Sequence, residues 1–174
     1  MFDKLPDLID PIYSAQHNKH FVARVNQQKF PRLVKQLVTA DNDVNVNVQF
    51  YMHPQHKLAA FDMELDSVLK LKCQRSLKAF DYPVESSVTG VFVETMALAD
   101  DLPDDLEIYE LSDEKISLIE LIEDEVLLNV PLSPIDESSE MAYTNPPEID
   151  ESVSEDTEKK NPFAALKGLQ KDPD

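Results

Sequence analysis

The 174-residue sequence contains only two glycines and one cysteine. Gly90 and Gly168 leave no material for a phosphate-cradling loop, which argues strongly against a nucleotide-binding fold. A lone cysteine, Cys73, excludes an internal disulfide and is typical of a reducing compartment, so we expect a cytoplasmic protein. No apolar run approaches the roughly 20 residues that a membrane helix needs, and residues 1–6 do not resemble a signal peptide.

Basic residues are nearly absent from one part of the chain. Residues 100–158 hold 21 acidic residues and a single basic one, Lys115, whereas residues 1–99 hold 11 of each. A run of like charge is often a solvated segment without fixed structure. Alternatively, the acidic part mimics or shields against nucleic acid, or binds a basic partner such as a ribosomal protein. On either interpretation this part does not bind RNA directly, because phosphate repels it.

The best-specified element is a helix predicted over residues 117–129. Ser117 followed by Glu120 has the spacing of a capping box. The apolar residues after it cover one face of the helix, and Pro131 disfavours helix beyond about residue 129. The opposite face carries acidic residues that we expect to be solvated: Glu120, Glu123 and Asp124.

Two segments show the period-two alternation of half-buried strands. Residues 44–50 alternate throughout, and residues 59–73 place apolar side chains at odd positions. A turn at residues 53–56 joins the two segments. Val68 breaks the alternation of the second segment, which suggests a bulge or bend near Ser67.

Further elements complete an α+β fold, an antiparallel β-meander packed against the main helix. A third strand is predicted over residues 79–93, with Pro83 at an edge or bulge, and another over residues 106–111. Residues 31–38, which begin with a proline, predict a short amphipathic helix. The first fifteen residues are interpreted as extended.

The domain organisation follows from composition. Residues 1–134 are predicted to form one compact α+β domain. Residues 135–160 are acidic, rich in Ser and Pro and nearly free of large apolar residues, so we expect a disordered linker. Residues 161–171 predict a short C-terminal helix that begins at Asn161 and Pro162. Its apolar face forms a possible partner-binding anchor in the helix-in-groove manner, made of Phe163, Leu166 and Leu169.

Three segments resemble one protein family. Residues 121–134 (LIEDEVLLNVPLSP) are similar to the "EDE…LxxP…P" signature of the bacterial YceD-like family of large ribosomal RNA subunit accumulation proteins. Residues 71–75 and 161–169 fit the same family in the same order. The resemblance implies a factor that supports synthesis, processing or stability of large-subunit (23S) ribosomal RNA. Its partners would be the rRNA precursor or basic ribosomal or RNA-processing proteins.

The resemblance also bears on Cys73. Many family members have a second cysteine where this chain has Ser76, and another near the position of Met141, a spacing that suggests a metal or redox knuckle in those relatives. This chain keeps one of the three, so we expect no metal and no cofactor. Cys73 is instead interpreted as an inward residue of its strand, because a free cysteine behaves as a small hydrophobe.

The densest basic cluster, here called the basic tip, surrounds Cys73. It is either ordinary solubilisation of a strand end or a phosphate-contacting surface. Aromatic residues are sparse nearby, which argues against sequence-specific readout of single strands. The possible RNA contacts are the basic tip itself and a second group before it: Lys70, Lys72, Arg75 and Lys78, then Lys29, Arg32 and Lys35, with Arg24 close by in sequence.

No catalytic constellation is found. The two H-x-x-H pairs, His17 with His20 and His53 with His56, are interpreted as surface loop residues. The acidic run at residues 120–125 has no accompanying nucleophile, glycine-rich loop or metal ligand set. We therefore expect a non-enzymatic ribosome biogenesis factor without a small-molecule substrate. The alternatives are an acidic chaperone or adaptor for a basic ribosomal protein, and an RNA-binding module acting through the basic tip.

Overall fold

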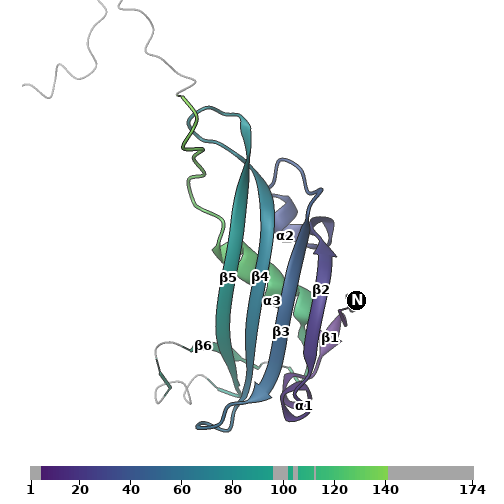
Figure 1. Cartoon of the computed structure of the whole chain (residues 1–174). Helices are drawn as coiled ribbons and strands as arrows, with labels where there is room; N and C mark the ends of the chain where they lie inside the picture. Colours follow the sequence, from purple (N-terminus) through teal and green to yellow (C-terminus); the bar gives the residue numbers. More distant parts are fainter. Residues whose placement is uncertain (1–4, 96–101, 104–105, 112, 141–174) are drawn as a thin grey trace, which may run out of the picture. The chain divides into compact units, whose positions relative to one another are not determined.

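The computed structural model describes residues 5–95, 102–103, 106–111 and 113–140. A five-stranded sheet in the order β2-β3-β4-β5-β6 dominates this part, and helix α3 (Leu118–Leu128) lies behind one of its faces in Figure 1. The predicted α+β fold is confirmed. The strands of the sheet are β2 (His20–Asn26), β3 (Asp43–Met52), β4 (Ala59–Lys72), β5 (Ala79–Val93) and β6 (Glu107–Glu110). A two-stranded pair joins β1 (Leu8–Ile9) to β7 (Ile116–Ser117).

Strands β2 to β5 form the predicted antiparallel meander. The odd residues of β4 are buried and most even ones are exposed, as the alternation predicts. The predicted bulge is wrong, because the pairing runs unbroken through Ser67 and Val68. Ser67 takes an inward position because its hydroxyl accepts from Nε2 of Gln27 and donates to the Asp43 carbonyl. Val68 is simply an exposed apolar residue.

Strand β5 is continuous through Pro83, which pairs with Val68 of β4. On its other side β5 pairs with β6 only at residues 90–93, so Pro83 lies along a stretch with no second neighbour among the described strands, as its missing N–H favours. Strand β6 is parallel to β5, which departs from the simple meander.

Gly90 sits beneath an aromatic cluster at the junction of β4, β5 and β6. A Cβ atom at this position would overlap Cε1 of Phe61 and lie 2.9 Å from Cε2 of Tyr109. The Phe61 ring centroid is 5.4 Å from that of Tyr109 and 5.4 Å from that of Phe92. The absence of a side chain on Gly90 therefore lets these rings close over the strand.

Helix α3 has the predicted bounds to within a residue at each end. Ser117 Oγ accepts the N–H of Glu120 at 3.2 Å, and Asn129 caps the C-terminus. Its buried apolar side chains complete a core with the inward residues of the sheet. These helix residues are Leu118, Leu121, Ile122 and Val126.

Two short helices differ from prediction. Helix α2 (Pro31–Val34) is shorter than the predicted 31–38, because Val38 N–H donates to the Lys70 carbonyl and draws the chain toward β4. Helix α1 (Pro11–Gln16) lies where an extended segment was expected, and Asp10 caps it by accepting from Tyr13 N–H. None of the helices in the described part is long and apolar enough to span a membrane.

Residues 1–142 form one compact unit. Residues 141–174 lie outside the described part, so the C-terminal helix over 161–171 and most of the acidic linker stay predictions. Asp136 and Ser139, at the predicted start of that linker, do hydrogen-bond to the β4–β5 turn.

Candidate functional site

Two carboxylates in the acidic run of α3, Glu123 and Glu125, are buried and bind to neighbouring elements. Both carboxylate oxygens of Glu123, which is 1 % exposed, are occupied. Oε1 accepts from the backbone N–H of Arg32 at 2.6 Å and of Leu33 at 3.0 Å, and Oε2 accepts from Arg32 Nε at 2.8 Å. Glu123 thereby caps the N-terminus of α2, whose own N-cap residue, Phe30, offers no side-chain acceptor.

The prediction that Glu123 is solvated is therefore wrong. Burial raises the pKa of Glu123, but the hydrogen bonds from Leu33 and Arg32 outweigh burial and hold the pKa below its ordinary value. Asp124, which is exposed as predicted, adds a second ion pair to the same guanidinium, 2.6 Å from Arg32 Nη1. The sequence carried one usable signal: a helix that begins Phe30-Pro31 lacks a polar cap and needs an acceptor from elsewhere.

Glu125 anchors the opposite side of α3. It is 6 % exposed, and Oε1 accepts from Ser86 Oγ of β5 and from Asn129 Nδ2 at 3.1 Å. The three acidic residues, here called the α3 acidic cluster, thus tie one helix to α2 on one side and to β5 on the other. Because their described bonds are structural, we assign them no acid–base chemistry.

Cys73 begins the β4–β5 turn and is fully buried, as predicted. Its Sγ accepts from Ser76 N–H and Asp136 N–H, each at 3.4 Å, and lies 3.3 Å from Ser139 Oγ. Burial raises the pKa of the thiol, but the bonds from Ser139, Ser76 and Asp136 outweigh it and lower the pKa to about 6. Hydroxyl and amide groups thus surround the sulfur in place of further thiolates.

Three of the predicted RNA contacts are engaged within the protein. Arg32 binds the α3 acidic cluster, Lys70 Nζ lies 2.6 Å from Asp81, and Arg75 Nη2 donates to the Asp136 carbonyl at 2.8 Å. The other four are exposed: Lys29, Lys35, Lys72 and Lys78. Their contact with RNA stays a proposal.

The histidines lie apart from any ligand set. His53 and His56 occupy the β3–β4 turn, where His53 Nδ1 accepts from His56 N–H at 3.3 Å. His20 Nε2 lies 2.6 Å from Asn47 Oδ1, and His17 Nδ1 lies 2.8 Å from the Tyr13 carbonyl. Among the described residues, no group of three or more His, Cys, Asp or Glu is placed to hold a metal ion.

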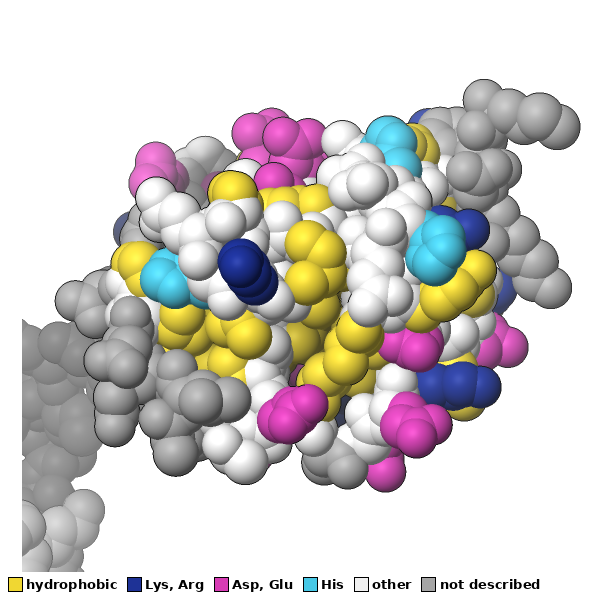
Figure 2. Space-filling view, turned by 90° about the horizontal axis from the view of Figure 1, so that it is seen from below, with side chains coloured by type: hydrophobic (Ala, Val, Ile, Leu, Met, Phe, Trp, Pro, Cys, Tyr) yellow, Lys and Arg dark blue, Asp and Glu magenta, His cyan; other side chains and the backbone are white. Residues whose placement is uncertain are grey.

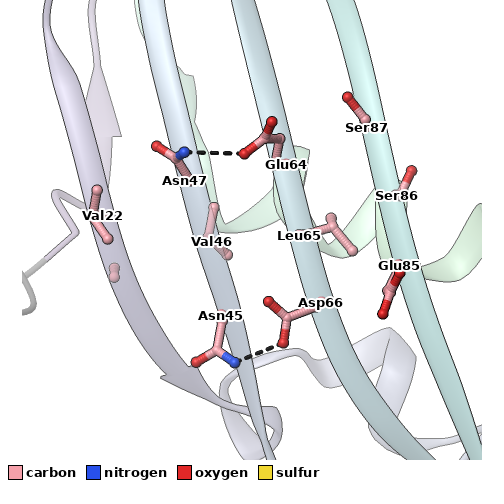
Figure 3. Close-up of a pocket in the computed structure, with 11 residues that line it drawn as sticks. Val22, Asn45, Val46, Asn47, Glu64, Leu65, Asp66, Glu85, Ser86 and Ser87 are labelled. Atoms are coloured by element: carbon pink, nitrogen blue, oxygen red, sulfur yellow. Dashed lines mark hydrogen bonds between the residues drawn. The ribbon is translucent and has the colours of Figure 1, made fainter.

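The face of the sheet turned away from α3 is here called the open face. A hollow of about 630 Å³ lies on it, and Figure 3 shows lining residues from four strands. Asn47 Nδ2 donates to Glu64 at 3.2 Å and Asn45 Nδ2 donates to Asp66 at 2.7 Å. The alternation of β4 predicts these outward residues, but it does not predict the hollow, which depends on how four strands curve together.

A second surface lies at the end of the body where α1 and the β3–β4 turn meet. Figure 2 looks onto this end, where hydrophobic side chains gather between histidine and acidic ones. Ile12 and Tyr13 of α1 are 42 % and 51 % exposed, and Met52 of β3 is 38 % exposed. The sequence patterns did not predict this surface, because α1 was not recognised.

Comparison with known proteins decides the family. The family model described as "Large ribosomal RNA subunit accumulation protein YceD" matches residues 61–170. This span contains the α3 acidic cluster and the basic tip. The chain belongs to the YceD family. The resemblance noted from three short segments is confirmed.

Two relatives give the extent of the similarity. The Haemophilus influenzae protein named "Large ribosomal RNA subunit accumulation protein YceD" is 32% identical over 169 residues, covering 96% of this chain and 97% of that protein. The Bacillus subtilis "Uncharacterized protein YlbN" is 30% identical over 123 residues, covering 68% of this chain and 70% of that one. No solved structure matches the chain.

Proposed function

We propose that this YceD-family protein is a non-enzymatic cytoplasmic factor that supports the accumulation of large-subunit ribosomal RNA by binding other molecules. The name of its Haemophilus influenzae relative supports the rRNA role. One observation supports a binding role over catalysis. The α3 acidic cluster holds α3 against α2 and β5, and both carboxylate oxygens of Glu123 are occupied by hydrogen bonds. Partners are the rRNA precursor or proteins that accompany it.

The proposal is tested by affinity purification of the tagged full-length chain, with and without ribonuclease, reading both RNA and protein. We expect large-subunit rRNA or its proteins to be enriched over small-subunit material. Equal recovery of the two subunits, or of neither, contradicts the proposal. Phe163→Ala in the same experiment tests the predicted C-terminal anchor. If the anchor binds a protein partner, the variant should no longer recover a protein that wild type recovers even after ribonuclease treatment.

A direct RNA contact at the basic tip is a second candidate. The exposure of Lys72 and Lys78 favours it, while the ion pair of Lys70 with Asp81 and the carbonyl bonds of Arg75 count against a full set of four contacts. Two exposed lysines supply few phosphate contacts, so binding should have a shallow salt dependence. Lys72→Gln with Lys78→Gln should abolish it, and unchanged RNA affinity would exclude this site.

A further inference from the structure

The open face of the sheet is uncovered by any described element. Strand β4 presents Asp62, Glu64 and Asp66 there, all exposed, and β5 contributes Glu85 beside them. Alternate residues of a strand point to the same face, roughly 6.7 Å apart. The face therefore carries a straight row of three carboxylates along its central strand, with a fourth on the neighbouring strand.

The carboxylates of this row are held by neutral donors. Asp62 Oδ1 accepts from Tyr51 Oη at 3.1 Å and from Thr89 Oγ1 at 2.8 Å. Glu64 and Asp66 accept from asparagine side chains of β3. Such bonds orient a carboxylate without cancelling its charge, and each carboxylate keeps at least one oxygen lone pair for another donor.

Cations are few along this stretch of the face. Arg24 of β2 approaches Asp43, 4.0 Å away, and donates to Asn45. Lys70 lies farther along β4 and pairs with Asp81. None of the described ion pairs involves a carboxylate of the row. The row thus combines fixed geometry with charge that the described ion pairs leave unbalanced.

The row lies along a depression made of three adjoining hollows. The hollow of about 630 Å³ adjoins one of about 380 Å³ toward Asp62 and one of about 310 Å³ toward Pro83. Neighbouring hollows share lining residues, Glu64 between the first two and Asp66 between the first and third. The depression therefore follows the strands over the length of the row, which suits an elongated ligand better than a small molecule.

We propose that the open face binds an extended, arginine- and lysine-rich segment of a protein partner. Alternate side chains of an extended segment repeat at roughly 6.7 Å, the spacing of the carboxylate row. Guanidinium and ammonium groups complement the unbalanced charge and accelerate association, whereas RNA is repelled from it. The inference rests on the proposed function and deepens it by naming the class of partner.

The test uses full-length protein and a fluorescein-labelled peptide of twelve residues in which arginine and threonine alternate. The Asp62→Asn, Glu64→Gln, Asp66→Asn triple variant keeps side-chain size and removes the row. The matched control, Glu148→Gln, Asp150→Asn, Glu151→Gln, removes the same charge from the predicted acidic linker, residues 135–160. Fluorescence anisotropy reports peptide affinity, and thermal unfolding confirms that each protein is folded.

We expect the row variant to lose about tenfold or more in affinity, because several ion pairs are removed together. The control should lose less than about twofold. Equal loss in both variants, or no loss in the row variant, overturns the proposal in favour of unspecific attraction between opposite charges. If the row variant unfolds, the single change Glu64→Lys, on an exposed side chain, must produce the same selective loss.

This result is separable from the proposed function. A wild-type chain that binds the peptide through the row but has no effect on large-subunit rRNA in cells would contradict the proposed function and leave the binding face standing. A chain that supports rRNA accumulation but binds the peptide no better than the row variant would contradict the binding face and leave the proposed function standing.

Discussion

The substitution Glu123→Gln should destabilise the protein far more than the substitution Glu120→Gln. Glu123 accepts three hydrogen bonds while only 1 % exposed. The glutamine side-chain oxygen can still accept hydrogen bonds from the two backbone N–H groups of α2, but these bonds are then between neutral groups. Its amide nitrogen replaces Oε2 and sets a donor against the donor Nε of Arg32.

The magnitude follows from the kinds of bond involved. Hydrogen bonds to charged groups contribute about 1.5–3 kcal/mol each, against about 0.5–1.5 kcal/mol for neutral ones. One charged bond is lost and two become neutral, which would cost about 5 kcal/mol if the contributions added. The guanidinium partner is 47 % exposed and keeps its contact with Asp124, so solvent and Asp124 offset part of this. We expect a loss of about 2–3 kcal/mol in the free energy of unfolding.

Urea unfolding followed by circular dichroism measures this loss. Glu120→Gln is the matched control, because Glu120 is an exposed residue in the first turn of the same helix. Its substitution should change the free energy of unfolding by no more than about 0.5 kcal/mol. Equal effects of the two substitutions would refute the assignment of Glu123 as the cap of α2.

The effect of Glu123 should also depend on pH. Its folded-state pKa lies below the unfolded value, so its contribution is fully present above the ordinary carboxylate range of about 4.3 and is lost as pH falls through the lowered pKa. Glutamine does not titrate. The stability difference between wild type and Glu123→Gln should therefore shrink in acid, and a difference as large at pH 3 as at pH 7 would contradict the reasoning.

Three further outcomes are expected. Gly90→Ala should destabilise by about 1–3 kcal/mol in urea unfolding, because its Cβ would overlap Phe61; an unchanged midpoint would show that the ring moves freely. Ser117→Ala should lower the free energy of unfolding by about 1 kcal/mol through loss of the α3 cap. Unchanged stability would show that Ser117 is not a stabilising cap. Thiolate absorbance near 240 nm should rise through pH about 6 and vanish in Cys73→Ala; a midpoint above pH 8 would contradict the lowered pKa.

Local signals predicted most of the fold. The capping serine, the apolar stripe and Pro131 define α3 within its own segment, and the alternation of β4 predicts which residues are buried. Non-local contacts account for the errors. Ser67 faces inward because Gln27, forty residues away, donates to it, and α2 ends early because residue 38 bonds to β4. Helix α1 has a local signal, because Asp10 is a polar N-cap followed by a proline at the first helical position.

The functional surfaces were less predictable. The local sequence pattern places Glu123 on a solvated helix face. Its buried position depends on Arg32, which lies 91 residues earlier in the chain. The row on β4 is visible in the sequence as alternating acids, but its hollow depends on the register of four strands. Exposure of lysines in the basic tip could be expected, whereas the bonds of Arg75 to the segment after α3 could not.

The central proposal is that this YceD-family protein supports the accumulation of large-subunit rRNA. Its most direct test is the ratio of 23S to 16S rRNA in cells that lack the protein, compared with the same cells supplied with the full-length chain. We expect the ratio to fall in its absence and to recover when the chain is supplied. A ratio that is unchanged by loss of the protein would contradict the account.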